Sequence, residues 1–322
     1  MVDVVFCLDD NFSMPTGITI LSLLHYNTDY SFYFHIVSMG ISEVNKQRLL
    51  QCIPDSSKLT FYEIDEELVS KLPVRENDHI TLGTYLRLFL PTIIPSEIKT
   101  ILYLDGDFLC VSSIKNLIDE NISNYSAIVA IDNMADDVRV RNRLSLPLDY
   151  SYFNAGMMYI NLDYWRKNNI QDETFNYIIQ NQDKCIAHDQ DGLNKILCST
   201  LKFVSARYNM APPFFYNYKN ELIDKKYYND LQESLLAPCL IHQWGPIKAW
   251  DKESNLPYLS IWRYFYRHSP WKYQKLKYKS SFKQLLFNKI RTIIVKNKEQ
   301  SYDKTKEIEL LRELELTDGE IK

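Results

Sequence analysis

The sequence predicts an α/β fold in which a mainly parallel central sheet is covered by helices on both faces. Short apolar runs of strand length alternate with amphipathic runs of helix length through the first 130 residues, and this alternation is typical of βαβ units. The 322 residues, 46% hydrophobic and 24% charged, suffice for one large domain that needs no disulfides. The six cysteines show no CxxC spacing, so we expect free thiols.

Five strands are expected in the N-terminal half, each a short run rich in β-branched, aromatic or leucine side chains, at residues 4–8, 32–37, 59–64, 101–104 and 127–131. Helical patterns lie between them at residues 18–25, 42–52 and 84–90. Ser42 is a suitable N-cap for the second helix, because its hydroxyl can accept a hydrogen bond from a free backbone N–H.

The C-terminal half is less regular. We expect a strand at 154–161, helical segments within 164–182, a short helix at 191–198 and a strand at 238–243. Beyond residue 257 the chain becomes basic and aromatic, with an amphipathic helix at 282–295. One domain is therefore expected over residues 1–271, followed by a basic helical appendage over residues 272–322.

Acidic side chains follow three of the expected strands. Asp9, Asp105 and Asp132 each come directly after an apolar run. In open parallel sheets, ligands bind at the carboxyl ends of the strands. These three carboxylates are therefore candidates for one binding site.

The most informative of these positions is the turn Asp105-Gly106-Asp107. Two carboxylates placed two residues apart suit Mg²⁺ or Mn²⁺ when a phosphate completes the coordination shell. Gly106 is expected to let the backbone turn so that both side chains reach one ion. The alternative is a solvated turn in which Asp is only a loop former.

A second candidate cluster begins at His242, near the end of the strand expected at 238–243. A glycine turn at Gly245 would open backbone N–H groups toward an anion, and Lys248, six residues after His242, adds a mobile cation suited to phosphate. The alternative is a structural histidine and a surface lysine beside a core tryptophan.

Two further clusters have equally ordinary alternatives. The polar string from residue 188 to 194 contains Asp189, Gln190 and Asp191, and it could simply cap the following helix with Asp191 as the N-cap. Residues 153–156 include small residues between the aromatic side chain of Tyr152 and an apolar strand. The alternative is an ordinary tight turn at the start of a strand.

Together and in this order, these clusters resemble glycosyltransferase family eight, whose members include glycogenin and bacterial lipooligosaccharide galactosyltransferases. The likeness runs over about residues 2–271. It is carried by residues 6–12, Thr84-Tyr85-Leu86-Arg87, residues 103–107, Phe153-Asn154-Ala155-Gly156, Asp189-Gln190-Asp191 and residues 242–250. The resemblance implies a GT-A type fold and transfer of a sugar from a UDP-sugar with retention of anomeric configuration.

The resemblance also implies which residues hold the metal and the diphosphate. Asp105, Asp107 and His242 would bind Mn²⁺ (or Mg²⁺), which bridges the UDP diphosphate, while Gly245 and Lys248 would hold the leaving diphosphate. The sequence departs from the family pattern at Gln243 and Ala249, where an aromatic residue and a proline are common. Neither departure removes a ligand, but both could shift the loop that carries Lys248.

The remaining matching positions would surround the donor. Asp9, Asn11 and Phe12 would contact the uracil and ribose of the donor. Arg87, Asp189 and Asn154 would lie at its sugar. Gln190 would lie on the β face near the anomeric carbon, and Asp132 would line the boundary between donor and acceptor. Because an amide is a poor nucleophile, we expect a front-face reaction in which the acceptor hydroxyl enters on the side that the phosphate leaves.

The function predicted is therefore a retaining hexosyltransferase that moves glucose or galactose from UDP-glucose or UDP-galactose to a glycan, lipid-linked or protein-linked acceptor. Two alternatives stay open: a metal-dependent nucleotide-sugar hydrolase or nucleotidyltransferase that uses the same Asp pair, and a catalytically idle UDP-sugar-binding module. Variable loops at residues 134–152 and 212–228 are expected to form the acceptor site.

The charge distribution is uneven. Residues 255–298 contain eleven Lys or Arg and no Asp or Glu, so the net charge of −4 leaves −15 on the rest of the chain. A basic amphipathic helix with aromatic neighbours favours peripheral contact with an anionic membrane. We expect a cytoplasmic protein, so this contact would be with the inner face of the membrane. The alternative is a helix packed on the domain. We expect no nucleic-acid partner, because the basic residues are confined to this appendage.

Overall fold

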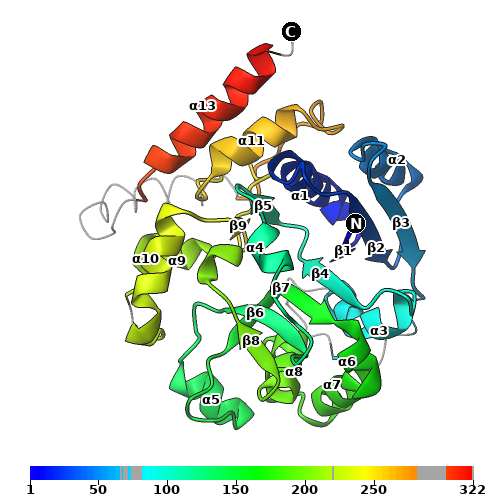
Figure 1. Ribbon diagram of the computed structural model, residues 1–322, viewed down its shortest axis with the longest axis vertical. Helices are drawn as coiled ribbons and strands as arrows, with labels where there is room; N and C mark the ends of the chain where they lie inside the picture. Colours follow the sequence, from blue (N-terminus) through cyan, green and yellow to red (C-terminus); the bar gives the residue numbers. More distant parts are fainter. Residues whose placement is uncertain (66, 68–71, 74–81, 220, 281–301, 321–322) are drawn as a thin grey trace.

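The computed structural model describes residues 1–65, 67, 72–73, 82–219, 221–280 and 302–320. Its centre is a seven-stranded sheet with the strand order β3-β2-β1-β4-β7-β6-β8 (Figure 1). The strands are β1 (Val2–Cys7), β2 (Phe32–Ser38), β3 (Lys58–Glu63), β4 (Thr100–Leu104), β6 (Ala127–Ile131), β7 (Phe153–Asn161) and β8 (Leu201–Phe203). Strand β7 runs antiparallel to its neighbours β4 and β6, and the other pairings are parallel. The expected mainly parallel sheet is confirmed.

Helices cover both faces of this sheet. On one face lie α1 (Ser13–Tyr26), α2 (Glu43–Gln51) and α11 (Leu259–Arg267), and on the other α3 (Leu90–Ile93), α6 (Leu162–Lys167), α7 (Ile170–Gln180) and α8 (His188–Leu197). The segment expected to be helical at 84–90 is a 3₁₀ helix, η3 (Leu82–Phe89), which leads directly into α3. Shorter helices complete the domain: α4 (Lys115–Ile118), α5 (Val138–Leu144), α9 (Pro212–Asn217) and α10 (Tyr228–Leu236).

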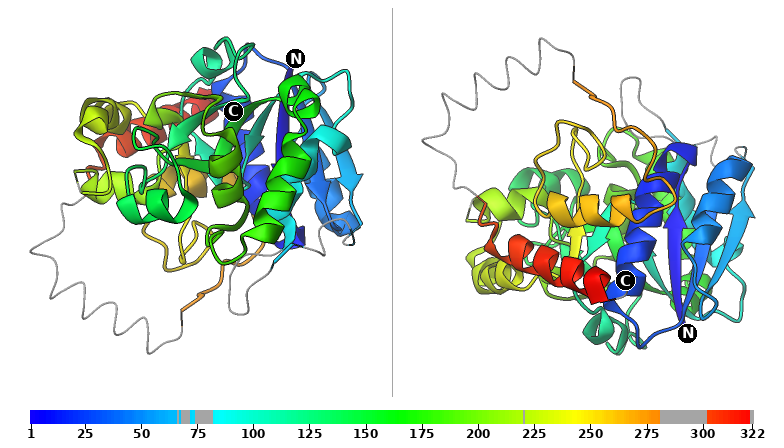
Figure 2. Two further views of the ribbon diagram at one scale, coloured as in Figure 1. Left: turned by 90° about the horizontal axis from the view of Figure 1, so that it is seen from below. Right: turned by 90° about the horizontal axis from the view of Figure 1, so that it is seen from above.

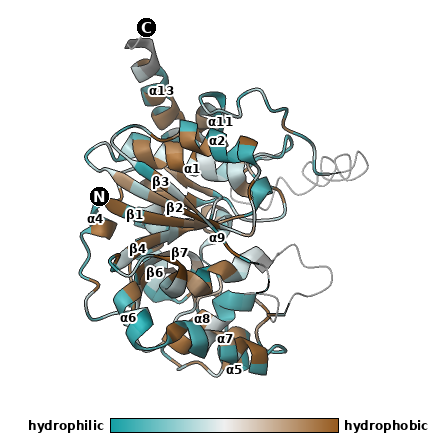
Figure 3. Cartoon of the chain, turned by 90° about the vertical axis from the view of Figure 1, so that its right-hand side faces the viewer, coloured by the Kyte–Doolittle hydropathy of each residue, from teal (hydrophilic) through white to brown (hydrophobic). Residues whose placement is uncertain are grey.

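The apolar runs of the central strands are explained by burial on two sides. In β1, Val4 and Phe6 belong to the hydrophobic cluster under α1 and α11, whereas Val5 belongs to the cluster with Leu86 and Trp165 on the opposite face. A strand that is covered on both faces does not need polar and apolar residues in alternation, because both of its faces are buried. Figure 3 shows the result, with hydrophobic strands at the centre and helices of mixed hydrophobic and hydrophilic residues on either side.

A small antiparallel ribbon lies beside the main sheet and carries part of the candidate site. It consists of β5 (Phe108–Cys110) and β9 (Leu240–His242), with Phe108 opposite His242. The ribbon is fixed to α1, because the hydroxyl of Thr19 donates a hydrogen bond to the carbonyl of Phe108 at 2.6 Å. Since β5 follows β4 after only three residues, the turn between them joins the sheet to the ribbon.

The C-terminal helix α13 (Thr305–Glu320) lies along α11 (Figure 2). Leu310 and Leu314 are buried in the main hydrophobic cluster. The buried carboxylate of Glu307 accepts hydrogen bonds from the backbone N–H groups of Ser260 at 2.8 Å and Tyr258 at 3.2 Å, at the start of α11. Residues 305–320 are therefore anchored on the domain.

The amphipathic helix expected at 282–295 lies outside the described residues, and the division of the chain after residue 271 stays a prediction. No helix in the described ranges combines the length and the apolar character that crossing a bilayer requires.

Candidate active site

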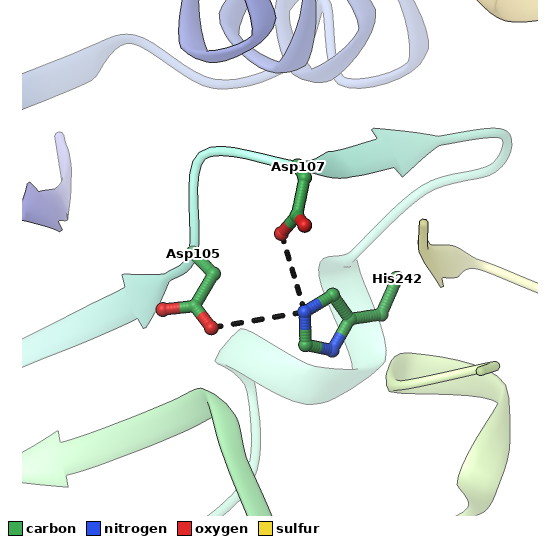
Figure 4. Close-up of side chains that lie close together, drawn as sticks. All are labelled: Asp105, Asp107 and His242. Carbon is green, nitrogen blue, oxygen red and sulfur yellow. Dashed lines mark ion pairs between the residues drawn. The ribbon is translucent and has the colours of Figure 1, made fainter. Parts of the chain in front are cut away.

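Three potential metal ligands converge where the sheet meets the ribbon. Asp105 follows β4, and its backbone N–H donates to the carbonyl of Gly156 on β7 at 2.8 Å. Asp107 directly precedes β5, and His242 ends β9, with its ring stacked on Phe108 at a centroid distance of 4.2 Å. Figure 4 shows both carboxylates turned toward the His242 ring.

Asp105, Asp107 and His242, together called the metal cluster, have a geometry that fits a divalent cation. The Nε2 atom of His242 lies 3.2 Å from Oδ1 of Asp107 and 3.7 Å from Oδ2 of Asp105. One ligand atom from each of the three residues lies within 4.8 Å of the others. Two carboxylate oxygens and an imidazole nitrogen suit Mn²⁺, and the oxygens also suit Mg²⁺. The expected combination of Asp105, Asp107 and His242 is present as a potential metal site.

Asp107 is held in its ionised form. Burial opposes ionisation of this carboxyl, but the ammonium of Lys248, whose Nζ lies 2.6 Å from Oδ2, and the ring of His242 lower the pKa of Asp107 well below its ordinary value. A carboxylate that stays ionised at neutral pH is available as a ligand. Lys248 therefore does face the cluster, despite the two departures beside it.

Two glycines are required by close packing, for a reason that the sequence did not indicate. Gly106 was expected to let the backbone turn so that both carboxylates reach one ion. Both carboxylates do face one potential site, but the φ of Gly106 is outside the left-handed region, so the turn itself does not require glycine. A Cβ at Gly106 would lie 2.3 Å from Oγ1 of Thr16, and a Cβ at Gly156 would lie 2.3 Å from the ring carbon Cε1 of His242. Close packing, and not an unusual backbone conformation, is therefore the reason for a glycine at position 106. Gly245, in contrast, has a φ of +129°, which favours glycine.

A buried arginine connects the metal cluster to α8. The guanidinium of Arg87 lies 3.1 Å from Oδ1 of Asp105 and 2.9 Å from Oδ2 of Asp189, and it donates to the carbonyl of Ala155 at 2.7 Å. Burial raises the pKa of Asp189, and Arg87 opposes that rise. Arg87 thus neutralises part of the negative charge that burial would otherwise make unfavourable.

Near Ala155, two amides and a carboxylate form a second polar group. The side chain of Asn154 donates to Oδ2 of Asp132 at 2.9 Å, and Gln190 donates to the same oxygen at 3.4 Å. The side-chain carbonyl of Gln190 accepts from the backbone N–H of Ala155 at 2.9 Å. Burial raises the pKa of Asp132, while the amide of Asn154 opposes the rise.

Comparison with known proteins now identifies the family. The sequence profile of Glycosyl transferase family 8 matches residues 3–254. The chain belongs to this family. General stress protein A of Bacillus subtilis is 28% identical over 278 residues, covering 84% of this chain and 95% of the relative. A lipopolysaccharide 1,2-glucosyltransferase of Escherichia coli is 28% identical over 295 residues, covering 88% of this chain and 85% of the relative.

A solved structure agrees with the fold of this family 8 chain. The galactosyltransferase LgtC, crystallised with donor and acceptor sugar analogues, superposes with a TM-score of 0.78 at 23% sequence identity, covering 85% of this chain and 100% of LgtC. At this level of identity the match establishes the fold alone. The protein is a family 8 glycosyltransferase with a GT-A type fold.

The residues expected at the uracil and ribose lie in one turn near Lys248. Asp9 caps a 3₁₀ turn, η1 (Asp10–Phe12), by accepting from the N–H of Phe12 at 3.1 Å. The Phe12 ring packs edge-on against Trp250 at 5.5 Å, and the Nζ of Lys248 lies 6.0 Å from the Phe12 ring. Asn11 is exposed in the same turn. The turn therefore flanks the Lys248 side of the cluster.

The position of Asp191 differs from the capping alternative. Helix α8 begins at His188, with Ala187 as its N-cap, so Asp191 lies inside the first turns. Its carboxylate accepts from the backbone N–H of Ala187 at 2.6 Å and from the hydroxyl of Tyr152 at 2.7 Å, and it pairs with Arg143 at 2.5 Å. Asp191 is buried and fixes the start of the helix that carries Asp189 and Gln190.

Three site residues of this family 8 chain had no role in the sequence prediction. Tyr103 donates to Oδ1 of Asp105 at 2.6 Å, and Thr84 donates to Oδ1 of Asp189 at 3.2 Å. Both stand inside segments that resemble the family, which was the only signal available. Asn209 contacts Nδ1 of His242 at 3.0 Å, and no motif surrounds it in the sequence.

Proposed function

We propose that this glycosyltransferase is a retaining hexosyltransferase that moves glucose or galactose from a UDP-sugar to a glycan acceptor with the help of Mn²⁺. The observation that carries the proposal is the convergence of Asp105, Asp107 and His242 beside Lys248. Such a site can hold a divalent cation and a diphosphate together. Mg²⁺ is the second candidate ion because two of the three ligands are carboxylates.

When bound, the metal ion supplies Lewis-acid stabilisation of a diphosphate leaving group. The chain itself contributes a second cation there. The ammonium of Lys248 is held 2.6 Å from Asp107 and lies about 6 Å from the Phe12 and Trp250 rings, so it is partly screened from water. A fixed positive charge in such a site stabilises negative charge that develops in the transition state.

Retention is proposed to follow a front-face route. The side chain of Gln190 is held by the N–H of Ala155 and by Asp132, and its amide is a poor nucleophile. In the proposed step, the acceptor oxygen bonds to the anomeric carbon while the bond from that carbon to the β-phosphate oxygen breaks. The proton of the acceptor hydroxyl passes to the departing phosphate.

For the acceptor, we propose a lipopolysaccharide-type glycan, supported by the name of the related E. coli enzyme. The two loops expected to bind it are joined through Asp136. Its backbone N–H donates to the carbonyl of Leu222 at 2.9 Å, and its carboxylate accepts from the N–H of Asp224 at 2.8 Å. These two hydrogen bonds hold the loops together, although neither loop contains a residue of the metal cluster.

The direct test is a screen of UDP-sugars for Mn²⁺-dependent UDP release, followed by analysis of the product anomer by NMR. Asp107→Ala should abolish metal-dependent turnover, whereas Gln190→Ala should leave measurable transfer. A Gln190→Ala protein as inactive as Asp107→Ala would rule out the front-face route. UDP release that proceeds equally well without an acceptor would favour the hydrolase alternative, and metal-dependent UDP binding without turnover would favour the idle module.

We also propose peripheral contact with an anionic membrane surface at the inner face of the membrane. The segment 272–279 exposes four lysines together with Tyr273 and Tyr278. Exposed basic and aromatic side chains in one stretch suit anionic lipid headgroups.

Vesicle sedimentation tests the membrane proposal. The wild type should pellet with phosphatidylglycerol vesicles and remain in solution with phosphatidylcholine vesicles. A variant with Lys272→Gln, Lys275→Gln and Lys277→Gln should lose most of this binding, since each lysine near an anionic surface contributes about 1 kcal/mol. Binding that is unchanged in this variant would contradict the role of the segment.

A further inference from the structure

Asn209 stands behind the metal cluster in a fixed position. It follows η4 (Ala206–Tyr208) and is almost fully buried. The next residue, Met210, forms a parallel bridge to Ile241; its N–H donates to Leu240 at 2.9 Å, and its carbonyl accepts from the N–H of His242 at 3.1 Å. These backbone hydrogen bonds hold the Asn209 side chain against the rear of the His242 ring.

The side chain of Asn154 has one permitted orientation. Its Oδ1 lies 3.0 Å from the backbone nitrogen of Gly156, which can only donate, and its Nδ2 lies 2.9 Å from Oδ2 of Asp132. Exchanging the oxygen and nitrogen would place two donors together at Gly156 and an oxygen against a carboxylate at Asp132. The backbone therefore fixes Oδ1 of Asn154 as an acceptor.

This orientation determines that of Asn209. The group of Asn209 that faces Asn154 must be its NH₂, which lies 3.0 Å from Oδ1 and 3.4 Å from the backbone carbonyl of Asn154. The other end of the amide, Oδ1 of Asn209, then faces Nδ1 of His242 at 3.0 Å. A carbonyl oxygen only accepts, so Nδ1 of His242 must carry a proton.

We propose that Asn209 is a positioning residue that keeps Nδ1 of His242 protonated and so presents the lone pair of Nε2 to the cation between Asp105 and Asp107. The proposal rests on the metal site of the proposed function. When Nδ1 carries a proton, the lone pair of the neutral ring is on Nε2, the nitrogen that faces Asp105 and Asp107, so the ring can bind a cation placed between the two carboxylates. Such hydrogen bonds to the rear nitrogen of a ligand histidine orient the ring and raise its basicity.

The same amide connects the metal ligand to the proposed donor side. From His242 the hydrogen bonds run through Asn209 and Asn154 to Asp132, which also accepts from Gln190. Asn209 therefore has two effects that substitution can separate. The first is its hydrogen bond to Nδ1 of His242, and the second is its contact with Asn154. Asn209→Ala removes both hydrogen bonds, whereas Asn209→Asp keeps an acceptor for Nδ1 but places a carboxylate oxygen against Oδ1 of Asn154.

Mn²⁺ binding to the full chain without substrate tests the first effect. In a titration followed by electron paramagnetic resonance, Asn209→Ala should bind Mn²⁺ about 10–100-fold more weakly than the wild type. Asn209→Asp should keep an Mn²⁺ affinity close to that of the wild type but lose turnover. Asn27→Ala is a matched control, because Asn27 is another buried amide with hydrogen bonds to Leu23 and Ile114, away from the metal cluster. Asn209→Ala with wild-type Mn²⁺ affinity would overturn the proposal.

A second measurement is independent of metal binding and of activity. In the metal-free protein labelled with ¹⁵N-histidine, the Nδ1 resonance of His242 should have the shift of a protonated nitrogen, and the signal is assigned by its loss in His242→Gln. An unprotonated Nδ1 in the wild type would overturn the inference. If the wild type binds no Mn²⁺, the metal in the proposed function fails, and a change of this resonance in Asn209→Ala then tests the hydrogen bond between Nδ1 of His242 and Asn209 by itself.

Discussion

Lys248 depends on its own loop for its position. Its backbone N–H donates to Oδ2 of Asp251 at 2.7 Å, and the neighbouring Ala249 is fully buried. Gln243, the other departure from the family pattern, is buried and donates to the carbonyl of Pro257 at 3.2 Å. Both departures are accommodated by packing, and the ammonium still reaches Asp107.

Lys248→Ala should therefore reduce kcat by about 10²–10³-fold while weakening UDP binding much less, because the charge on a leaving diphosphate is greatest in the transition state. Steady-state kinetics and calorimetric titration with UDP measure the two quantities. Lys252→Ala serves as the control, since Lys252 is exposed and contacts Tyr278. Equal losses in kcat and in UDP affinity would count against this role.

Single residues were predictable where a chemical pattern surrounded them. Asp105, Asp107 and His242 were recognisable because two carboxylates come after one apolar strand and a histidine lies at the end of another. Asn209 was not, because its importance comes from Met210 pairing with β9, a contact between segments that sequence spacing does not reveal. The reason for Gly106 was missed in the same way, since it depends on the proximity of Thr16 in α1.

Among the elements, length decided what could be predicted. Long apolar strands such as β1 and β2 were located to within two residues, whereas β5 and β8 have three residues each, too few for a periodic pattern. Helix α13 lies within the appendage that was expected to be helical, but its own bounds were not predicted. It is rich in charged residues, and its buried apolar side chains, Leu310 and Leu314, stand among them.

Helix α13 stabilises the domain through Glu307, which acts as an N-cap for α11 from a distant part of the sequence. Glu307→Gln should lower the free energy of unfolding by about 1–2 kcal/mol, because an amide replaces a buried carboxylate that accepts from two backbone N–H groups and a hydroxyl. Urea unfolding measures this difference. Glu309→Gln, at an exposed position that pairs with Lys306, should change stability by less than about 0.5 kcal/mol. Similar losses in both variants would contradict the capping role.

At the scale of the whole molecule, strand direction explains why the site forms. Strands β1, β4 and β6 point the same way, so Asp9, Asp105 and Asp132 come to one edge of the sheet. Strand β7 is antiparallel and contributes Asn154 from its first residues at that edge. The alternation of elements predicted the shared direction of β1, β4 and β6. It did not predict the reversal of β7, because an apolar run carries no sign of its direction.

The ligands of the proposed metal come from both the sheet and the ribbon, so a bound ion should stabilise the fold as a whole. Mn²⁺ and UDP together should raise Tm, and at 100 times Kd the expected stabilisation is about 2.7 kcal/mol. Differential scanning fluorimetry with and without both ligands measures the shift. Asp107→Ala should show no metal-dependent shift. A shift as large as that of the wild type would mean that the ion binds elsewhere.

The docking of α13 also restricts how this protein can be engineered. A chain shortened before residue 305 would expose the apolar surface that Leu310 and Leu314 cover and would leave the N–H groups of Tyr258 and Ser260 without their carboxylate. Truncation would therefore confuse loss of a surface contact with loss of folding. Substitutions that change charge in place, within the full-length polypeptide, separate the two.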